Sequence, residues 1–119
     1  MAIVEELIGK VFATRNAVHL AHWKTKSYAE HQALGSFYEA LIDKIDAIVE
    51  AYQGAFGLVK SVDIPTISDS NLLNHLDDEV VWIDSNRDKV SKKVRAIENL
   101  IDELTGEYLS TIYKLRNLK

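Results

Sequence analysis

The feature that most constrains the fold is the near absence of residues that end a helix. The chain of 119 residues contains one proline, Pro65, and five glycines. Proline interrupts a helix, and glycine in a helix interior costs about 1 kcal/mol relative to alanine. Few of the dipeptides that form hairpin turns occur, whereas Ala, Leu, Ile, Glu and Lys, which favour helix or tolerate it well, are frequent. The sequence therefore predicts an all-α fold.

Apolar residues at helical spacing predict a first helix from Ala2 to about Lys24. A capping box then marks the start of a second helix, because Ser27 is followed three residues later by Glu30. In such a box the two side chains satisfy backbone N–H groups that have no partner inside the helix. The second helix is expected to begin near Tyr28.

The apolar stripe of the second helix continues until two glycines, Gly54 and Gly57, either of which could close it in a left-handed conformation. We place its end near Phe56. The segment from Gly57 to Ser70 contains Pro65 and a cluster of Thr, Ser and Asp. This composition predicts that the chain crosses the end of the bundle here without regular structure.

The second half of the chain keeps nearly one apolar register throughout. A single helix over Asn71–Leu118 would be about 70 Å long and would leave its apolar stripe uncovered. The turn-forming segment Asp84–Asp88 is the best place for a break. We therefore expect helices over about 70–84 and 86–118. One domain over 1–119 results, an antiparallel four-helix bundle with a longer connection between its second and third helices.

Composition excludes several classes of function. Because the chain has no cysteine, it has no disulfide, and any metal must be held by His and carboxylates. This composition suits a reducing cytoplasm. A formal net charge of −4 argues against nucleic acid as the default partner. No basic and apolar leader occupies Met1–Leu7, and no apolar stretch is long enough to span a membrane, so neither targeting nor anchoring is expected.

The main functional signal is the density of histidines around the first turn. His19, His22 and His31 fall within thirteen residues. His19 and His22 are about one helical turn apart and can face the same side, and His31 lies in the first turn of the next helix. The reversal of the chain could therefore bring the three rings together.

A pair of carboxylates, Asp46 and Glu50, lies further along the second helix on one face. Such a pair can bind a hard or borderline cation. His31 and Asp46 are separated by about 22 Å along a straight helix, so they cannot bind one ion within one chain. Two copies related by a two-fold axis, with these helices antiparallel, would bring them together twice per dimer.

The segment His22-Trp23 and the run Tyr28–Glu50 resemble the Dps-type mini-ferritins. In that family a His-Trp pair ends the first helix, a second His opens the next, and a D-x-x-x-E pair follows fifteen residues later. The resemblance implies a ferritin-like fold in which iron(II) binds between subunits and is oxidised by peroxide or oxygen. It also implies a homo-oligomer of at least two subunits, which in the family can be a hollow dodecamer that stores ferric mineral.

The same resemblance assigns roles to individual residues. It makes His22, His31, Asp46 and Glu50 the iron ligands and the catalytic residues of a ferroxidase, with Glu50 able to bridge to a second ion. His19 is the alternative first ligand, since it has the family's usual interval to His31.

A second hypothesis follows from three differences from that family. The interval between His22 and His31 is shorter, Gly35 stands where the family has an acidic residue, and Ala51 stands where it has arginine. The alternative is a catalytically silent, ferritin-like helical oligomer that acts as a structural or interaction protein. DNA compaction would need a basic surface, which the charge does not indicate. The acidic run Asp77–Glu79 is interpreted as a solvated helix face.

Overall fold

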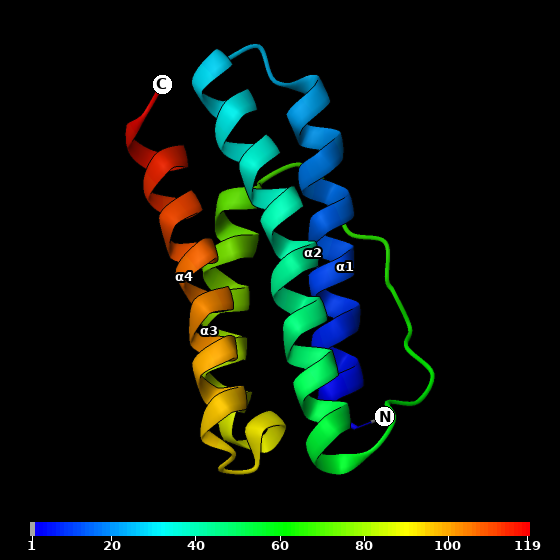
Figure 1. Ribbon diagram of the computed structural model, residues 1–119. Coiled ribbons are helices and arrows are strands. Elements are labelled where there is room, and N and C mark those ends of the chain that lie inside the picture. Colours follow the sequence, from blue (N-terminus) through cyan, green and yellow to red (C-terminus); the bar gives the residue numbers. More distant parts are fainter. Residues whose placement is uncertain (1) are drawn as a thin grey trace.

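The computed structural model describes residues 2–119, and its regular structure in that range is entirely helical. The four helices are α1 (Ile3–Lys24), α2 (Tyr28–Phe56), α3 (Leu72–Ser91) and α4 (Arg95–Asn117). They pack as a bundle about 44 Å long, which confirms the predicted all-α, four-helix architecture (Figure 1). Within the described range, no helix is long and apolar enough to cross a membrane.

The ends of α2 lie where the sequence predicts them. The Ser27 hydroxyl accepts a hydrogen bond from the Glu30 N–H at 3.2 Å. The Ser27 N–H donates to the Thr25 hydroxyl rather than to Glu30, so only half of the capping box forms. At the other end Gly57, with φ of 101°, stops the helix, and its N–H donates to the Gln53 carbonyl oxygen. Of the two glycines, it is therefore Gly57 that closes α2.

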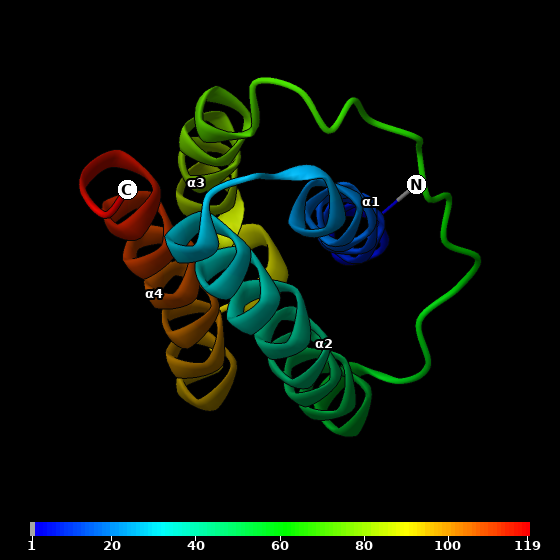
Figure 2. The same cartoon turned by 90° about the horizontal axis from the view of Figure 1, so that it is seen from above.

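Neighbouring helices are antiparallel throughout the bundle. α1 packs against α2 and α3, and α4 packs against the same two helices. α2 and α3 run in the same direction and lie diagonally opposite each other (Figures 1 and 2). The chain must therefore return along the bundle between them, which explains the long connection.

This connection, residues 57–71, contains no helix and is called the strap below. It passes along the outer side of α1, as the view from above shows (Figure 2). Its backbone is held to the start of α1, because the Lys60 N–H donates to Glu5 Oε2 at 2.8 Å. The Asp63 carbonyl oxygen lies so close to Gly9 that a Cβ there would be 2.2 Å from it.

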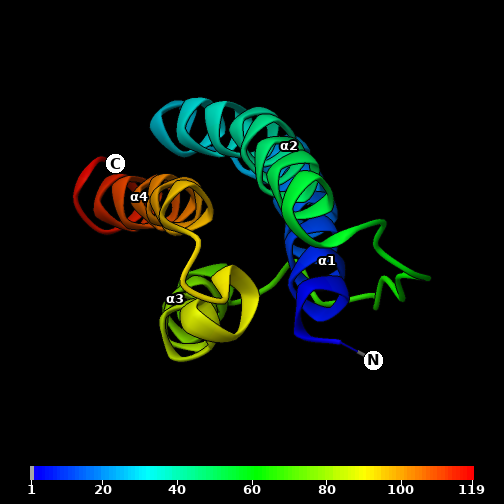
Figure 3. The same ribbon diagram turned by 60° about the horizontal axis from the view of Figure 1, so that its bottom comes forward.

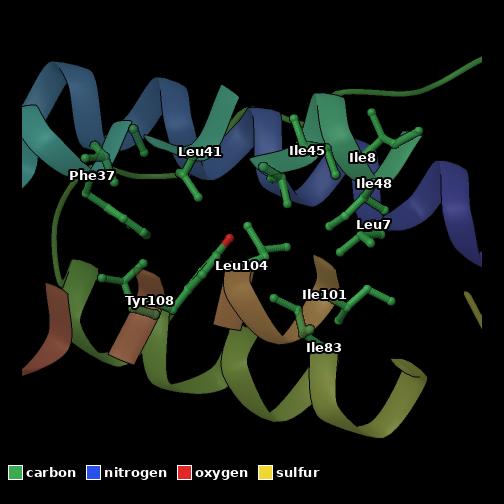
Figure 4. Packing of buried hydrophobic residues seen from close by; sticks show 14 of the residues in the cluster. Leu7, Ile8, Phe37, Leu41, Ile45, Ile48, Ile83, Ile101, Leu104 and Tyr108 are labelled. Atoms are coloured by element: carbon green, nitrogen blue, oxygen red, sulfur yellow. The ribbon is translucent and has the colours of Figure 1, made fainter. Parts of the chain in front are cut away.

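The core is a continuous column of aliphatic side chains with two large rings. Phe37 and Tyr108 are both almost fully buried and meet edge to face, with ring centroids 5.1 Å apart. Around them Figure 4 shows the aliphatic side chains of all four helices, among them Leu7, Leu41, Ile45, Ile48, Ile83, Ile101 and Leu104. The apolar stripes from which the helices were predicted are thus buried in this core.

The predicted break between the last two helices was wrong. Residues 84–88 lie inside α3, and the turn is formed by Lys92 and Lys93, both left-handed with φ of 50° and 68°. Some of the polar side chains of this segment find partners on the helix surface instead of in a turn. In particular, the Arg87 guanidinium binds Asp102 of α4 through two hydrogen bonds of 2.7 and 2.8 Å.

Candidate functional site

His22 and His31 form a reciprocal pair where α1 turns into α2. The Nδ1 atom of His22 lies 2.7 Å from the His31 carbonyl oxygen, and the Nδ1 atom of His31 lies 2.8 Å from the His22 carbonyl oxygen. A carbonyl oxygen only accepts, so each Nδ1 carries a hydrogen and donates it. When the rings are neutral, both Nε2 atoms are therefore left as acceptors.

The two rings also stack on each other, with centroids 3.7 Å apart and planes inclined by 16°. The predicted approach of His22 and His31 across the turn is confirmed. Lone pairs on parallel rings at this separation do not converge on one ion at about 2.1 Å, the usual length of a metal–imidazole bond. In this arrangement the two Nε2 atoms could each act as a separate metal ligand, but they do not chelate one ion together.

Gly35 gives the His22 ring its place. A Cβ at position 35 would lie 2.9 Å from His22 Cε1 and 3.2 Å from Nδ1, closer than van der Waals contact allows. Only a residue without a side chain leaves room for the ring while it keeps its hydrogen bond to His31. This is the physical reason why glycine, and not an acidic residue, stands at this position.

Further aromatic rings extend the pair along the surface. His19 stacks on Tyr38, with ring centroids 4.0 Å apart, and contacts Trp23 at 4.4 Å. The side chains of Trp23 and Tyr28 are 66% and 74% exposed. We call this set the aromatic face; its members are His19, His22, Trp23, Tyr28, His31 and Tyr38.

The surroundings of His19 in the aromatic face perturb its pKa. Burial lowers the pKa of His19 below its ordinary value, and the positive charge of Arg15 and the neighbouring His22 lower it further. The Arg15 guanidinium lies 5.3 Å from the centre of the Tyr38 ring, on which His19 stacks. Neutral imidazole is therefore favoured at this position.

Asp46 and Glu50 lie on the exposed side of α2, away from the histidines. They follow His31 by fifteen and nineteen residues, or about 22 and 28 Å along the helix. In residues 2–119 no group of three or more His, Cys, Asp or Glu side chains is close enough to hold a metal ion. The described chain thus brings the histidines together and keeps the carboxylates apart from them.

A buried polar network was missed by the sequence analysis. Glu79 is only 4% exposed, so the interpretation of Asp77–Glu79 as a solvated face is wrong for this residue. Its Oε1 accepts from the Thr14 hydroxyl at 2.8 Å and from the Tyr108 hydroxyl at 2.5 Å, and its Oε2 lies 2.9 Å from His75 Nε2. The sequence did contain a signal for this burial, because Glu79 follows Leu76 by three residues and so lies in the buried stripe of α3.

This network joins α1, α3 and α4 inside the core. Burial, together with the nearby Glu79 carboxyl, raises the pKa of Tyr108 well above 10. The Thr14 hydroxyl lies 2.8 Å from Glu79 Oε1 and 2.8 Å from His75 Nε2. All these groups satisfy one another, and none of them lines a described pocket. We assign the network to stability rather than to chemistry.

Comparison with known proteins gives two matches. A family of unknown function, DUF5856, matches residues 22–115. The chain belongs to this family. It is also 32% identical over 115 residues to an uncharacterized 14.6 kDa protein of the mobD-ri intergenic region of Enterobacteria phage T4. That alignment covers 93% of this chain and 86% of the phage protein. No solved structure matches the chain.

These matches overturn the resemblance to the Dps-type mini-ferritins. The family that covers most of the chain is a different one, and the phage relative is not described as a ferritin. The spacing of His22, His31, Asp46 and Glu50 therefore does not identify the family. The geometry at Gly35 agrees with this correction, because the His22 ring occupies the space in which an acidic side chain would begin.

Proposed function

We propose that the protein is a non-catalytic interaction protein that associates with a second copy of itself through the aromatic face. The exposure of Trp23 and Tyr28, 66% and 74%, is the observation that carries this proposal. Large aromatic side chains and arginine are enriched at the centres of protein interfaces, where they supply most of the binding energy. Here the exposed rings of Trp23 and Tyr28 pack beside the rings of His19 and His31. This packing restricts their motion before binding, which reduces the entropy lost on association.

The distribution of charge supports a second copy as the partner. The second half of α1 and the turn after it carry three basic residues, Arg15, Lys24 and Lys26. Further along, α2 exposes four acidic residues and has a single lysine among them. The acidic residues are Glu39, Asp43, Asp46 and Glu50. If two α2 helices pair antiparallel about a two-fold axis with His31 opposite Asp46, then Lys26 lies close to Glu50 of the other copy. Opposite charges then meet at the two ends of the contact.

Light scattering coupled to size-exclusion chromatography, over a range of protein concentrations, tests the association. We expect a dimer that Trp23→Ala and Tyr28→Ala together weaken by about tenfold or more. The matched control is Leu109→Ala with Tyr113→Ala, two α4 side chains of similar exposure, 52% and 56%. A protein that stays monomeric at all concentrations, or a control that weakens the dimer equally, would contradict the proposal.

Charge reversal tests the antiparallel register. Lys26→Glu and Glu50→Lys should each weaken the dimer, and the double variant should recover most of the lost affinity, because it restores opposite charges across the interface. Both positions are exposed, so neither change disturbs the core. Losses that simply add in the double variant would refute this register.

Iron(II) binding is a second candidate function, favoured by the two free acceptor atoms. With each Nδ1 tied to a carbonyl oxygen, the Nε2 atoms of His22 and His31 are presented as metal ligands usually are. In the proposed dimer, Asp46 and Glu50 of the second copy would approach them. Imidazole with carboxylate is a donor set that suits iron(II), and bound iron could be oxidised by oxygen or peroxide. One imidazole would have to turn out of the stack to share an ion with the other.

Anaerobic titration with iron(II), followed by oxygen or peroxide, tests this candidate through the ferric absorbance. Asp46→Ala with Glu50→Ala should abolish saturable binding. Glu39→Ala with Asp43→Ala removes the same charge from the same exposed side of the helix and should leave binding intact. Equal behaviour of the two double variants would count against an iron site. The sizing experiment also reports any assembly larger than a dimer.

A further inference from the structure

The opposite end of the bundle from the aromatic face contains a separate pocket. It lies between the first turn of α1, the last turn of α2 and the beginning of the strap, at the end that comes forward in Figure 3. Its volume is about 670 Å³. The lining includes Glu5, Tyr52, Phe56, Lys60, Ser61 and Asp63.

The carboxyl group of Glu5 is incompletely satisfied in the wall of this pocket. The residue is only 4% exposed, and its Oε2 accepts from the Lys60 N–H at 2.8 Å. Its Oε1 is buried and has no hydrogen-bond partner among the described residues. A buried carboxyl oxygen without a partner costs free energy, which a bound donor would recover.

The remaining walls suit a cation with an apolar part. The rings of Tyr52 and Phe56 are 5.0 Å apart and supply aromatic surface. They already attract one ammonium group, since Lys92 Nζ lies 4.6 Å from the centre of Phe56 and 5.3 Å from that of Tyr52. The exposed Asp63 adds a second carboxylate to the lining.

We infer that this pocket binds a small alkylammonium ion. The ammonium group has three donors and no acceptor, which matches the unpartnered Glu5 oxygen, and its alkyl chain matches the aromatic wall. A metal ion would need several converging oxygen or imidazole ligands. Here one buried carboxyl group shares the pocket lining with aromatic rings, and the described residues contain no group of three metal-binding side chains.

NMR titration of the isotope-labelled full chain with propylammonium chloride tests the inference. We expect saturable shifts of the Gly57 and Lys60 amides, and none with 1-propanol, which has the same length and no charge. Glu5→Gln should weaken binding by about tenfold or more, because a hydrogen bond to a charged group is lost while Gln can still accept from Lys60. Glu6→Gln is the matched control, since Glu6 is the exposed neighbour and the change in net charge is the same.

Several outcomes would overturn the inference. They are the absence of saturable shifts with propylammonium, equal weakening by Glu6→Gln, and binding of magnesium chloride in place of propylammonium. Circular dichroism checks that Glu5→Gln folds. If that variant is unfolded, Asp63→Asn takes its place, because Asp63 is exposed and its side chain can change without disturbing the core. Unchanged propylammonium affinity in a folded variant of the pocket carboxylates would also refute the site.

Discussion

The imidazole of His22 occupies the space in which a side chain at position 35 would begin. A Cβ on Gly35 would lie 2.9 Å from His22 Cε1, and the ring is fixed by its hydrogen bond to the His31 carbonyl oxygen. A glycine in the middle of a helix is otherwise unfavourable. The cost of the glycine is therefore linked to the geometry of the histidine pair.

Gly35→Ala should lower the free energy of unfolding by about 1–3 kcal/mol, because the added methyl group meets the fixed ring. In a His22→Ala background the same change should raise it by about 0.5–1 kcal/mol, the ordinary gain of alanine over glycine in a helix. Gly54→Ala is the control, since nothing lies within 4 Å of its Cβ position. Urea denaturation measures all four variants. A change of the same sign in both backgrounds would disprove the steric link.

Tyr108→Phe should lower the free energy of unfolding by about 1.5–3 kcal/mol, because the buried Glu79 loses a hydrogen bond from its hydroxyl. Tyr113→Phe removes the same atom from a side chain that is 56% exposed and should have little effect. Chemical denaturation of the two variants gives the comparison. Equal stabilities would mean that the network contributes little.

The stability of the protein should fall as the pH decreases through the range in which His19 titrates. The pKa of His19 is lowered from its ordinary value of 6.5, so near and below that pH the unfolded chain binds a proton that the folded protein does not. The free energy of unfolding therefore rises with pH across this window. His19→Gln should remove this part of the slope. Denaturation between about pH 5 and pH 8 tests the slope, and NMR titration of His19 tests the pKa; a value above 6.5 would contradict it.

Gly9→Ala should release the strap from α1, because its Cβ would lie 2.2 Å from the Asp63 carbonyl oxygen, and a backbone atom cannot move aside alone. Limited digestion with trypsin should then cut faster after Lys60. Gly106→Ala, whose Cβ position has no neighbour within 4 Å, controls for the change of residue type. Unchanged protection of Lys60 in a folded Gly9→Ala variant would show that the contact does not hold the strap.

The helices could be predicted from the sequence because their signals are local. Helical spacing of apolar residues, the Ser27 cap and Gly57 define α1 and α2 almost to the residue. The turn between α3 and α4 has no such signal, since two lysines, Lys92 and Lys93, adopt the left-handed conformation that usually marks glycine or asparagine. The misleading polar segment is stabilised by α4, as the contact of Arg87 with Asp102 shows, and contacts between helices are not visible in local composition.

The candidate site was predictable only in part for a similar reason. His22 and His31 are close in the sequence, on either side of one turn, so their approach could be predicted. The burial of Glu79 depends on Thr14 and Tyr108, which lie 65 and 29 residues away in the sequence. The family resemblance was wrong because it rested on a few spacings along one helix face. Carboxylates four residues apart are common on any solvated helix.

Two contacts hold the strap along α1, and the chain between them is close to fully extended. Nineteen residues of α1 separate Glu5 from Lys24, or about 28 Å at the helical rise. Their partners on the strap are Lys60 and Asp69, the second joined to Lys24 by an ion pair of 2.6 Å. Nine extended residues cover only about 30 Å. Deleting two or three residues between Lys60 and Asp69 should therefore break one of these two contacts and free part of the strap from α1, although the shortened strap could still reach α3.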